Sequence, residues 1–115
     1  MKTLTLDIRP LGDTLTDFVQ AWDMGKGSGP RISFQTPMLL FKVLTGKRWE
    51  LLKAMTGAGP ITVREVARRV GRDVKAVHGD IRALLNTGIL QKTETSRILF
   101  PFDAVHVDFM LRAAS

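Results

Sequence analysis

Three polar side chains at helical spacing are the strongest candidates for chemistry in this chain of 115 residues. Lys75, His78 and Arg82 are three and four residues apart, so on a helix they would form one line along its surface. Two cations and an imidazole at that spacing suit contact with base edges and phosphates. Asn86 extends the same line by a further turn. The pattern predicts a helix face that binds nucleic acid.

Two His-x-Asp steps raise the alternative of an enzyme or a metal site. They occupy residues 78–80 and 106–108, and on a strand His106 and Asp108 would share one face, as an acid–base or metal-binding pair requires. The chain has two histidines and no cysteine, so a closed metal site would need clustered carboxylates that the sequence lacks. We therefore expect no catalytic activity, no metal and no other cofactor, and we interpret His106 as a packed strand residue.

The charge of the chain supports a polyanionic partner. The net charge is +6, from 17 Lys and Arg against 11 Asp and Glu. All of the surplus lies in residues 41–100, whereas residues 1–40 carry four charges of each sign. A localised basic excess is typical of a surface that binds nucleic acid, although arginines are also common on solvated helix faces.

Length and composition exclude several other classes of protein. A chain of 115 residues fits one domain with a single core. The absence of cysteine excludes a disulfide framework and a cysteine nucleophile. The clearly apolar runs, such as Met38–Phe41, are far shorter than a membrane span, and Asp7 and Arg9 interrupt the one stretch that resembles a signal peptide. We expect a cytoplasmic protein with no membrane partner.

The first 35 residues predict a strand-helix-strand extension. Residues 3–8 alternate polar and apolar, as in a half-buried strand, and residues 31–34 predict a second short strand. Between them, residues 13–22 have apolar side chains at the spacing of an amphipathic helix. The balanced charge and aromatic helix face of this extension suit contact with a second copy of the chain or with a protein partner.

Residues 36–115 contain clear start and stop signals for helices. Thr36 precedes Pro37, and Thr45 has the position of a second N-cap. Thr62 and Glu65 form a capping-box pattern for a helix that extends to Val70. Asp73 is a suitable N-cap for a helix over 74–86, which Gly88 follows at the usual left-handed position. Strands are predicted at 89–93, 97–100 and 105–109.

The order of these elements predicts a winged helix-turn-helix within an α+β fold. A helix, a short helix, a three-residue turn, a longer helix and a hairpin follow one another from residue 45 to 100. In that architecture the helix over 74–86 is the recognition helix and enters the major groove, and the wing over 89–100 contacts the DNA backbone. We therefore divide the chain into an N-terminal extension, 1–35, and a DNA-binding domain, 36–115.

Eight residues are the candidate DNA contacts. Four lie on the outward face of the recognition helix, two lie in the wing and are expected to contact phosphates, and two flank the groove from the preceding helix and turn. They are Lys75, His78, Arg82 and Asn86, Lys92 and Arg97, and Arg64 and Arg72. Asp80 would repel phosphate, so we expect it to lie to the side and to pair with an arginine of the preceding helix.

Four stretches of the sequence resemble a known group of proteins. They are FKVLT with KRWELL at 41–52, VREVARRVGRDVKAVH at 63–78, LLNTGIL at 84–90 and FPFDAVHVD at 100–108. Together they resemble a family of short prokaryotic predicted transcriptional regulators with MarR/ArsR-like winged helices. The resemblance implies DNA-binding regulation of transcription. Family members often have Arg at the position of Gly79, so this chain lacks one DNA contact that the resemblance implies.

A protein-interaction role is the main alternative to DNA binding. Some relatives in the resembling family lie beside toxin genes as antitoxins, which implies a chain that binds and neutralises a toxin and also regulates its own operon. A winged-helix scaffold can hold a protein as well as DNA, because fold does not determine function. For the DNA-binding interpretation we expect double-stranded DNA as partner and a homodimer as the active form, since one small module contacts few phosphates.

Overall fold

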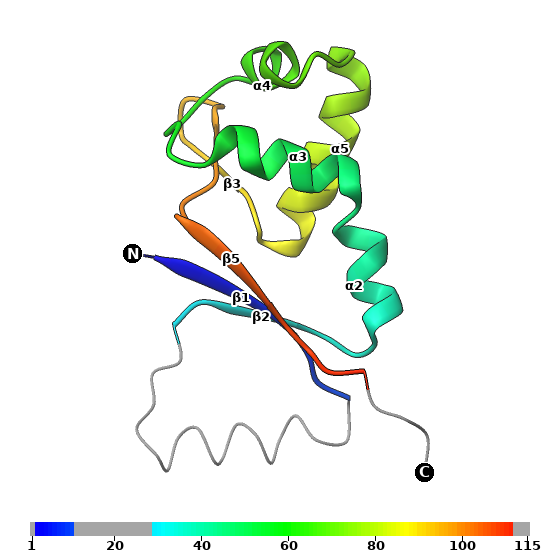
Figure 1. Cartoon of the computed structure of the whole chain (residues 1–115). Helices are drawn as coiled ribbons and strands as arrows, with labels where there is room; N and C mark the ends of the chain where they lie inside the picture. The colour runs from blue at the N-terminus through cyan, green and yellow to red at the C-terminus, as the bar shows by residue number, and fades with distance from the viewer. Residues whose placement is uncertain (1, 11–28, 112–115) are drawn as a thin grey trace.

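The computed structural model describes residues 2–10 and 29–111 of the chain (Figure 1). Within these ranges the fold is a small α+β domain. The predicted helix over 13–22, and with it the predicted aromatic surface for a toxin, lies outside the described residues. The described elements are β1 (Thr3–Ile8), β2 (Arg31–Phe34), α2 (Pro37–Val43), α3 (Gly46–Met55), α4 (Val63–Val70), α5 (Val74–Thr87), β3 (Gln91–Lys92), β4 (Ile98–Leu99) and β5 (Ala104–Asp108).

A three-stranded parallel sheet lies on one side of the helices (Figure 1). Its order is β2-β1-β5, and Leu6 of β1 is opposite Ile32 of β2 and Val107 of β5. The alternation of residues 3–8 places Leu4 and Leu6 on the buried face, as the period of two predicts. The sheet combines strands from both sides of residue 35, so the predicted extension and the rest of the chain share one sheet.

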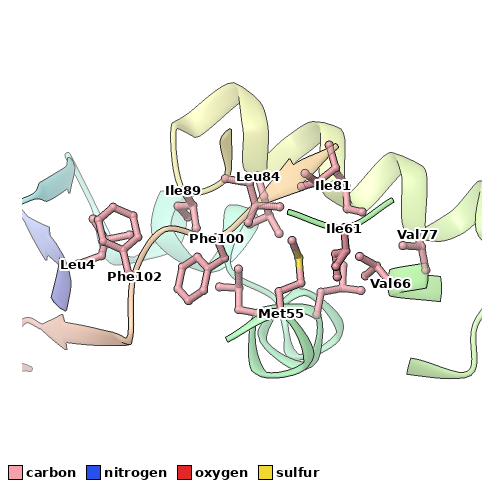
Figure 2. Close-up of a cluster of buried hydrophobic side chains, with 14 of the residues drawn as sticks. Leu4, Met55, Ile61, Val66, Val77, Ile81, Leu84, Ile89, Phe100 and Phe102 are labelled. Atoms are coloured by element: carbon pink, nitrogen blue, oxygen red, sulfur yellow. The ribbon is translucent and has the colours of Figure 1, made fainter. Parts of the chain in front are cut away.

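One hydrophobic core joins this sheet to the helices. Leu4 and Leu6 belong to the same buried cluster as Met55, Val77 and Leu84. Figure 2 shows the cluster continuing from Leu4 and Phe102 near the sheet, through Phe100, to side chains of α3, α4 and α5. Burial of this apolar surface is the main source of stability in a domain of this size.

Four predicted N-caps are confirmed. The side-chain oxygens of Thr36, Thr45 and Thr62 accept hydrogen bonds from the backbone N–H three residues later. The carboxylate of Asp73 accepts from the backbone N–H groups of Lys75 and Ala76 at 3.1 and 3.2 Å. Each cap satisfies a donor that the first helical turn leaves unpaired.

The capping box at the start of α4 is only half formed. Glu65 was expected to reach back to Thr62, but its carboxylate instead accepts from Arg68 at 2.5 Å and from Arg69 at 2.8 Å. These hydrogen bonds lower the pKa of Glu65 to about 2. The two arginines are three and four residues along the same helix, and charged donors compete better for a carboxylate than a neutral amide.

Two apolar residues that fit the helical spacing of the core are instead on the surface. Val74 begins α5 and Trp49 lies in α3, and they are 43% and 39% exposed. Val74 lies next to the α4–α5 turn, where no further element of the described chain covers it, so periodicity alone misassigns it. In α3 the buried side chains are Leu51, Leu52 and Met55.

Within the described ranges, none of the helices has the length and hydropathy needed to cross a lipid bilayer.

The predicted hairpin strands are shorter than expected, because β3 and β4 are two residues each. Gln91 pairs with Leu99 and Lys92 with Ile98 in an antiparallel ladder. Ile98 also exchanges two backbone hydrogen bonds with Ile61, of 2.7 and 3.0 Å. This bridge joins the base of the hairpin to the residue just before α4, so the hairpin is held against the helices.

Asp7 is a buried carboxylate on the central strand and is 5% exposed. It accepts hydrogen bonds from Ser33 at 2.5 Å, from Arg9 at 3.1 Å and from Arg31. Burial by itself would raise the pKa of Asp7, but hydrogen bonds from Ser33, Arg9 and Arg31 outweigh it and hold the pKa below the ordinary value. The network joins β1 to β2 on the sheet face opposite Leu6.

We predict that Asp7→Asn destabilises the fold and weakens its pH dependence. The lowered folded pKa means that the Asp7 carboxylate stabilises the fold above the unfolded pKa of 3.8, and that this stabilisation is lost as the pH falls through the folded pKa. The variant should therefore have a lower free energy of unfolding at pH 7 and a flatter decline below about pH 4. Urea titrations of the wild-type chain and the variant, at pH 7 and below about pH 4, measure the free energies of unfolding. An unchanged pH dependence of the stability would contradict the prediction.

Candidate nucleic-acid interface

The helix α5 presents a polar face away from the core. Asp73 is its N-cap, and Gly88 is its C-cap, with a φ of 87° in the left-handed region that favours glycine. Val77, Ile81 and Leu84 are buried on the inner side. The outer side carries the four predicted residues of the recognition helix, all exposed: Lys75, His78, Arg82 and Asn86.

A tight connection sets the angle at which α5 leaves α4. Gly71 ends α4 in the left-handed region, with a φ of 67°, and its N–H donates back to Ala67 and Arg68 carbonyls. A side chain at Gly71 would have open space around it but a strained backbone, so the requirement for glycine is conformational. With only residues 71–73 between them, the two helices cannot lie antiparallel and must cross.

A groove of about 330 Å³ lies between the second half of α5 and the hairpin. Its floor is apolar, and its rim includes four predicted contact residues, His78, Arg82, Asn86 and Lys92. Among the described residues, no acidic side chain lines it. The groove therefore combines cations and neutral hydrogen-bonding groups without a carboxylate that would repel phosphate. The complete lining is Val63, His78, Ile81, Arg82, Leu85, Asn86, Lys92, Ser96 and Ile98.

The hairpin tip is held by its own hydrogen bonds. Thr93 N–H donates to the Arg97 carbonyl at 2.8 Å, and Arg97 N–H donates to the Thr93 hydroxyl at 3.1 Å. Among the described residues, Ser96 is the non-glycine residue with a left-handed backbone conformation, and its φ is 61°. These contacts leave the side chains of Lys92 and Arg97 exposed on a fixed backbone.

Five predicted cations have no carboxylate partner among the described residues. These exposed side chains come from α4, α5 and the hairpin, and their charges are available to an external anion. Arg68 and Arg69, by contrast, pair with Glu65. The five, hereafter the free cations, are Arg64, Lys75, Arg82, Lys92 and Arg97.

Arg72 differs from the other predicted contacts because its guanidinium is engaged inside the protein. Its Nη2 donates to Asp80 Oδ2 at 2.8 Å, and its side chain is 24% exposed. Its Nη1 is buried without a hydrogen-bond partner. Any phosphate contact by Arg72 would therefore compete with an existing ion pair.

Asp80 connects α5 to two other parts of the domain. Besides Arg72 in the turn, its carboxylate accepts from Arg48 Nε of α3 at 3.0 Å. Asp80 therefore does lie to the side, but its partners are in the turn and α3, not in the preceding helix as expected. Arg48 also donates to the Lys42 and Val43 carbonyls at the end of α2, at 3.1 and 3.0 Å. One guanidinium thus links α2, α3 and α5.

The two arginines keep Asp80 ionised. Burial would raise its pKa, but hydrogen bonds from Arg72 and Arg48 outweigh that effect and the pKa is lowered. The side chain is only 17% exposed, so water screens the interaction less than it would on the open surface. The ion pairs also hold the one acidic side chain of α5 against α3 and the turn, and Asp80 does not line the groove.

The described residues provide no cluster suited to a metal ion. Within those ranges, no three His, Asp or Glu side chains come close enough together to hold one. His106 is exposed on β5, which differs from the expected packed position.

Residues 43–107 of the chain match the HVO_A0114 family, and the match covers more than half of the sequence. The chain belongs to this family. The matched region extends from the end of α2 into β5, so it contains the groove, the Asp80 ion pairs and the free cations. No curated protein matches the chain, and no solved structure does either. The name of the HVO_A0114 family states no activity.

Sequence reasoning missed the role of Arg48. This residue is 32 positions from Asp80, and no local pattern links two side chains at such a separation. Its neighbourhood in the sequence indicates only a solvated face of a helix. The contact depends on how α3 crosses α5, which is a property of the packed core.

We predict that Asp80→Asn lowers the free energy of unfolding by about 2 kcal/mol, because it weakens hydrogen bonds to two charged, partly buried donors. Glu94→Gln is a matched control, since it removes the same charge at an exposed hairpin position. Urea unfolding of both variants measures the difference. Equal stability of the two variants would show that Asp80 does not hold α5 in place.

Proposed function

We propose that the chain is a sequence-specific regulator of transcription that binds double-stranded DNA through a winged helix-turn-helix. The observation that carries the proposal is the groove between α5 and the hairpin. It brings four predicted contact residues together from two elements, and no acidic side chain of the described ranges lines it. Such a mixture of cations, an imidazole and an amide suits both phosphate and base contact.

The arrangement of the elements supports the winged-helix interpretation. The α4–α5 pair has the short connection of a helix-turn-helix, and a hairpin follows α5 directly. The backbone bridge between Ile61 and Ile98 holds the hairpin beside α4. In this proposal α5 is the recognition helix and the hairpin is the wing.

The positions of the side chains suggest a division of roles. Lys75 lies in the first turn of α5, which in a helix-turn-helix approaches the base edges most closely. Arg82 and Asn86 lie further along the groove rim, and Asn86 carries the amide that can pair with adenine. Lys92 and Arg97 on the hairpin would contact DNA phosphates, either on the same DNA strand or along a neighbouring groove.

The resemblance to MarR/ArsR-like transcriptional regulators supports the same function. The stretches that carry the resemblance include α4, both ends of α5 and β5. The HVO_A0114 match covers these elements as well. Capture of a toxin stays a prediction, because the surface expected to bind it lies outside the described residues.

We predict that Lys75→Ala with Arg82→Ala weakens DNA binding by at least about tenfold and flattens its salt dependence, because each lost contact reduces the number of counterions released. Fluorescence anisotropy with a duplex from the promoter of its own gene, at several salt concentrations, measures both quantities. Lys42→Ala with Lys53→Ala is the matched control, since it removes the same charge from exposed residues that do not line the groove. Equal weakening by both pairs, or affinity independent of salt, would contradict the proposal.

We predict that two substitutions at Gly79, around which an added side chain finds open space, have similar effects on stability and different effects on DNA binding. Gly79→Ala should stabilise the fold by up to about 1 kcal/mol, because alanine is a better helix former, and should leave DNA affinity unchanged. Gly79→Arg should stabilise the fold to a similar extent and should also tighten DNA binding, because it adds a cation beside His78. If Gly79→Arg leaves DNA binding unchanged, this part of α5 does not face DNA.

A further inference from the structure

The strand β5 has one edge without a partner among the described residues. The sheet order β2-β1-β5 places it at the edge, and its last three residues, 106–108, are exposed. An edge strand presents unpaired N–H and C=O groups to which another strand can bind. Figure 1 shows β5 as a continuous strand along β1.

The side chains of β5 are complementary to a second copy of the same strand. His106 and Asp108 share one face, since Thr5 and Asp7 are their register partners on β1. Neither has a hydrogen bond or ion pair with another described residue. If two β5 strands run antiparallel with Val107 opposite Val107, each His106 lies opposite the Asp108 of the other copy. An imidazole N–H can then donate to a carboxylate at both ends of the pairing.

The opposite face of β5 is apolar and partly uncovered. Val107 and Phe109 are 36% and 37% exposed, and the Phe109 ring packs edge-on against Phe41 of α2 at 5.8 Å. Phe41 is itself half exposed. A hollow of about 130 Å³ lies beside the start of β5, and Trp49 is one of the side chains that line it. The partly exposed apolar surface therefore extends to Trp49. Antiparallel pairing centred on Val107 would bring Phe109 opposite Val105 of the second copy and cover part of this surface.

We propose that the chain forms a two-fold symmetric dimer through antiparallel pairing of β5 with β5, centred on Val107. The pairing joins the two sheets into one of six described strands, in the order β2-β1-β5-β5-β1-β2. Each side of the interface is the same surface, as a two-fold dimer requires. The edge is hydrogen bonded, the polar face has two His–Asp pairs, and the apolar face is shielded from water.

The dimer deepens the proposed function but does not depend on it. A two-fold axis through Val107 relates the two copies of α5, so the DNA site would have two inverted half-sites. That consequence rests on DNA binding by α5. The pairing itself rests on β5 and can be measured in the absence of DNA, so failure of one proposal is distinguishable from failure of the other.

A single cysteine substitution tests the register of the pairing. The chain has no natural cysteine, and residues directly opposite in an antiparallel ladder lie within the distance that a disulfide bridges. Val107→Cys in the full chain should therefore form a disulfide-linked dimer under mild oxidation, detected by non-reducing electrophoresis. Glu94→Cys, at the exposed hairpin tip, is the control and should remain monomeric under the same conditions.

An exchange of charges tests the complementarity. His106→Asp places a carboxylate opposite Asp108 at both ends of the pairing, and we expect it to weaken the dimer by about tenfold or more. His106→Asp combined with Asp108→His restores opposite partners and should restore dimerisation. Sedimentation velocity over a range of protein concentrations measures association. Thermal unfolding at low concentration checks that the exposed substitutions leave the protomer folded.

Three outcomes would overturn the proposal. A wild-type chain that stays monomeric at high micromolar concentration would show that β5 does not pair. A dimer in which Val107→Cys fails to crosslink would place the interface elsewhere. Equal dimerisation by His106→Asp and by the exchanged double variant would show that the two residues do not face each other. DNA binding that fails while the dimer forms would contradict only the function of α5.

Discussion

The ion pairs of Asp80 are the interaction on which the proposed interface depends most directly. Asp80 is the acidic side chain of the helix that carries the candidate contacts, and it joins that helix to Arg48 of α3 and Arg72 of the turn. Arg48 in turn holds the end of α2 through two carbonyls. The buried side chains of α5 fix its depth in the core, whereas these directional bonds restrict its rotation and tilt. They also hold the carboxylate of Asp80 to the side of the helix, outside the groove lining.

The distribution of intramolecular ion pairs, more than the net charge, defines the interface. Glu65 pairs with Arg68 and Arg69 on α4, and Asp80 pairs with Arg48 and Arg72. The free cations on α4, α5 and the hairpin have no such partners within the described residues. Because a paired cation must give up its carboxylate before it binds a phosphate, the unpaired group contributes more to association with DNA. The basic excess of residues 41–100 therefore divides into a structural part and a part available for binding.

Local signals in the sequence predict the helices of this chain well. N-caps at Thr36, Thr45, Thr62 and Asp73 depend on side chains that bond within their own helical turn, so adjacent residues are sufficient evidence. The failures have non-local causes. Val74 and Trp49 fit an apolar period but lie where no described element covers them. Asp80 was expected to pair with an arginine of the preceding helix, whereas its partners lie in the α4–α5 turn and in α3.

The sequence by itself determined where helices begin and end, which face of α5 is polar, and that the positive charge is concentrated in residues 41–100. These properties depend on spacing and on bonds within a few residues. Only the tertiary structure decided that β5 pairs with β1 at the other end of the chain, that Arg48 reaches Asp80, and that the hairpin and α5 enclose one groove. Such contacts join residues far apart in sequence, and they form only when burial of the shared core brings the elements together.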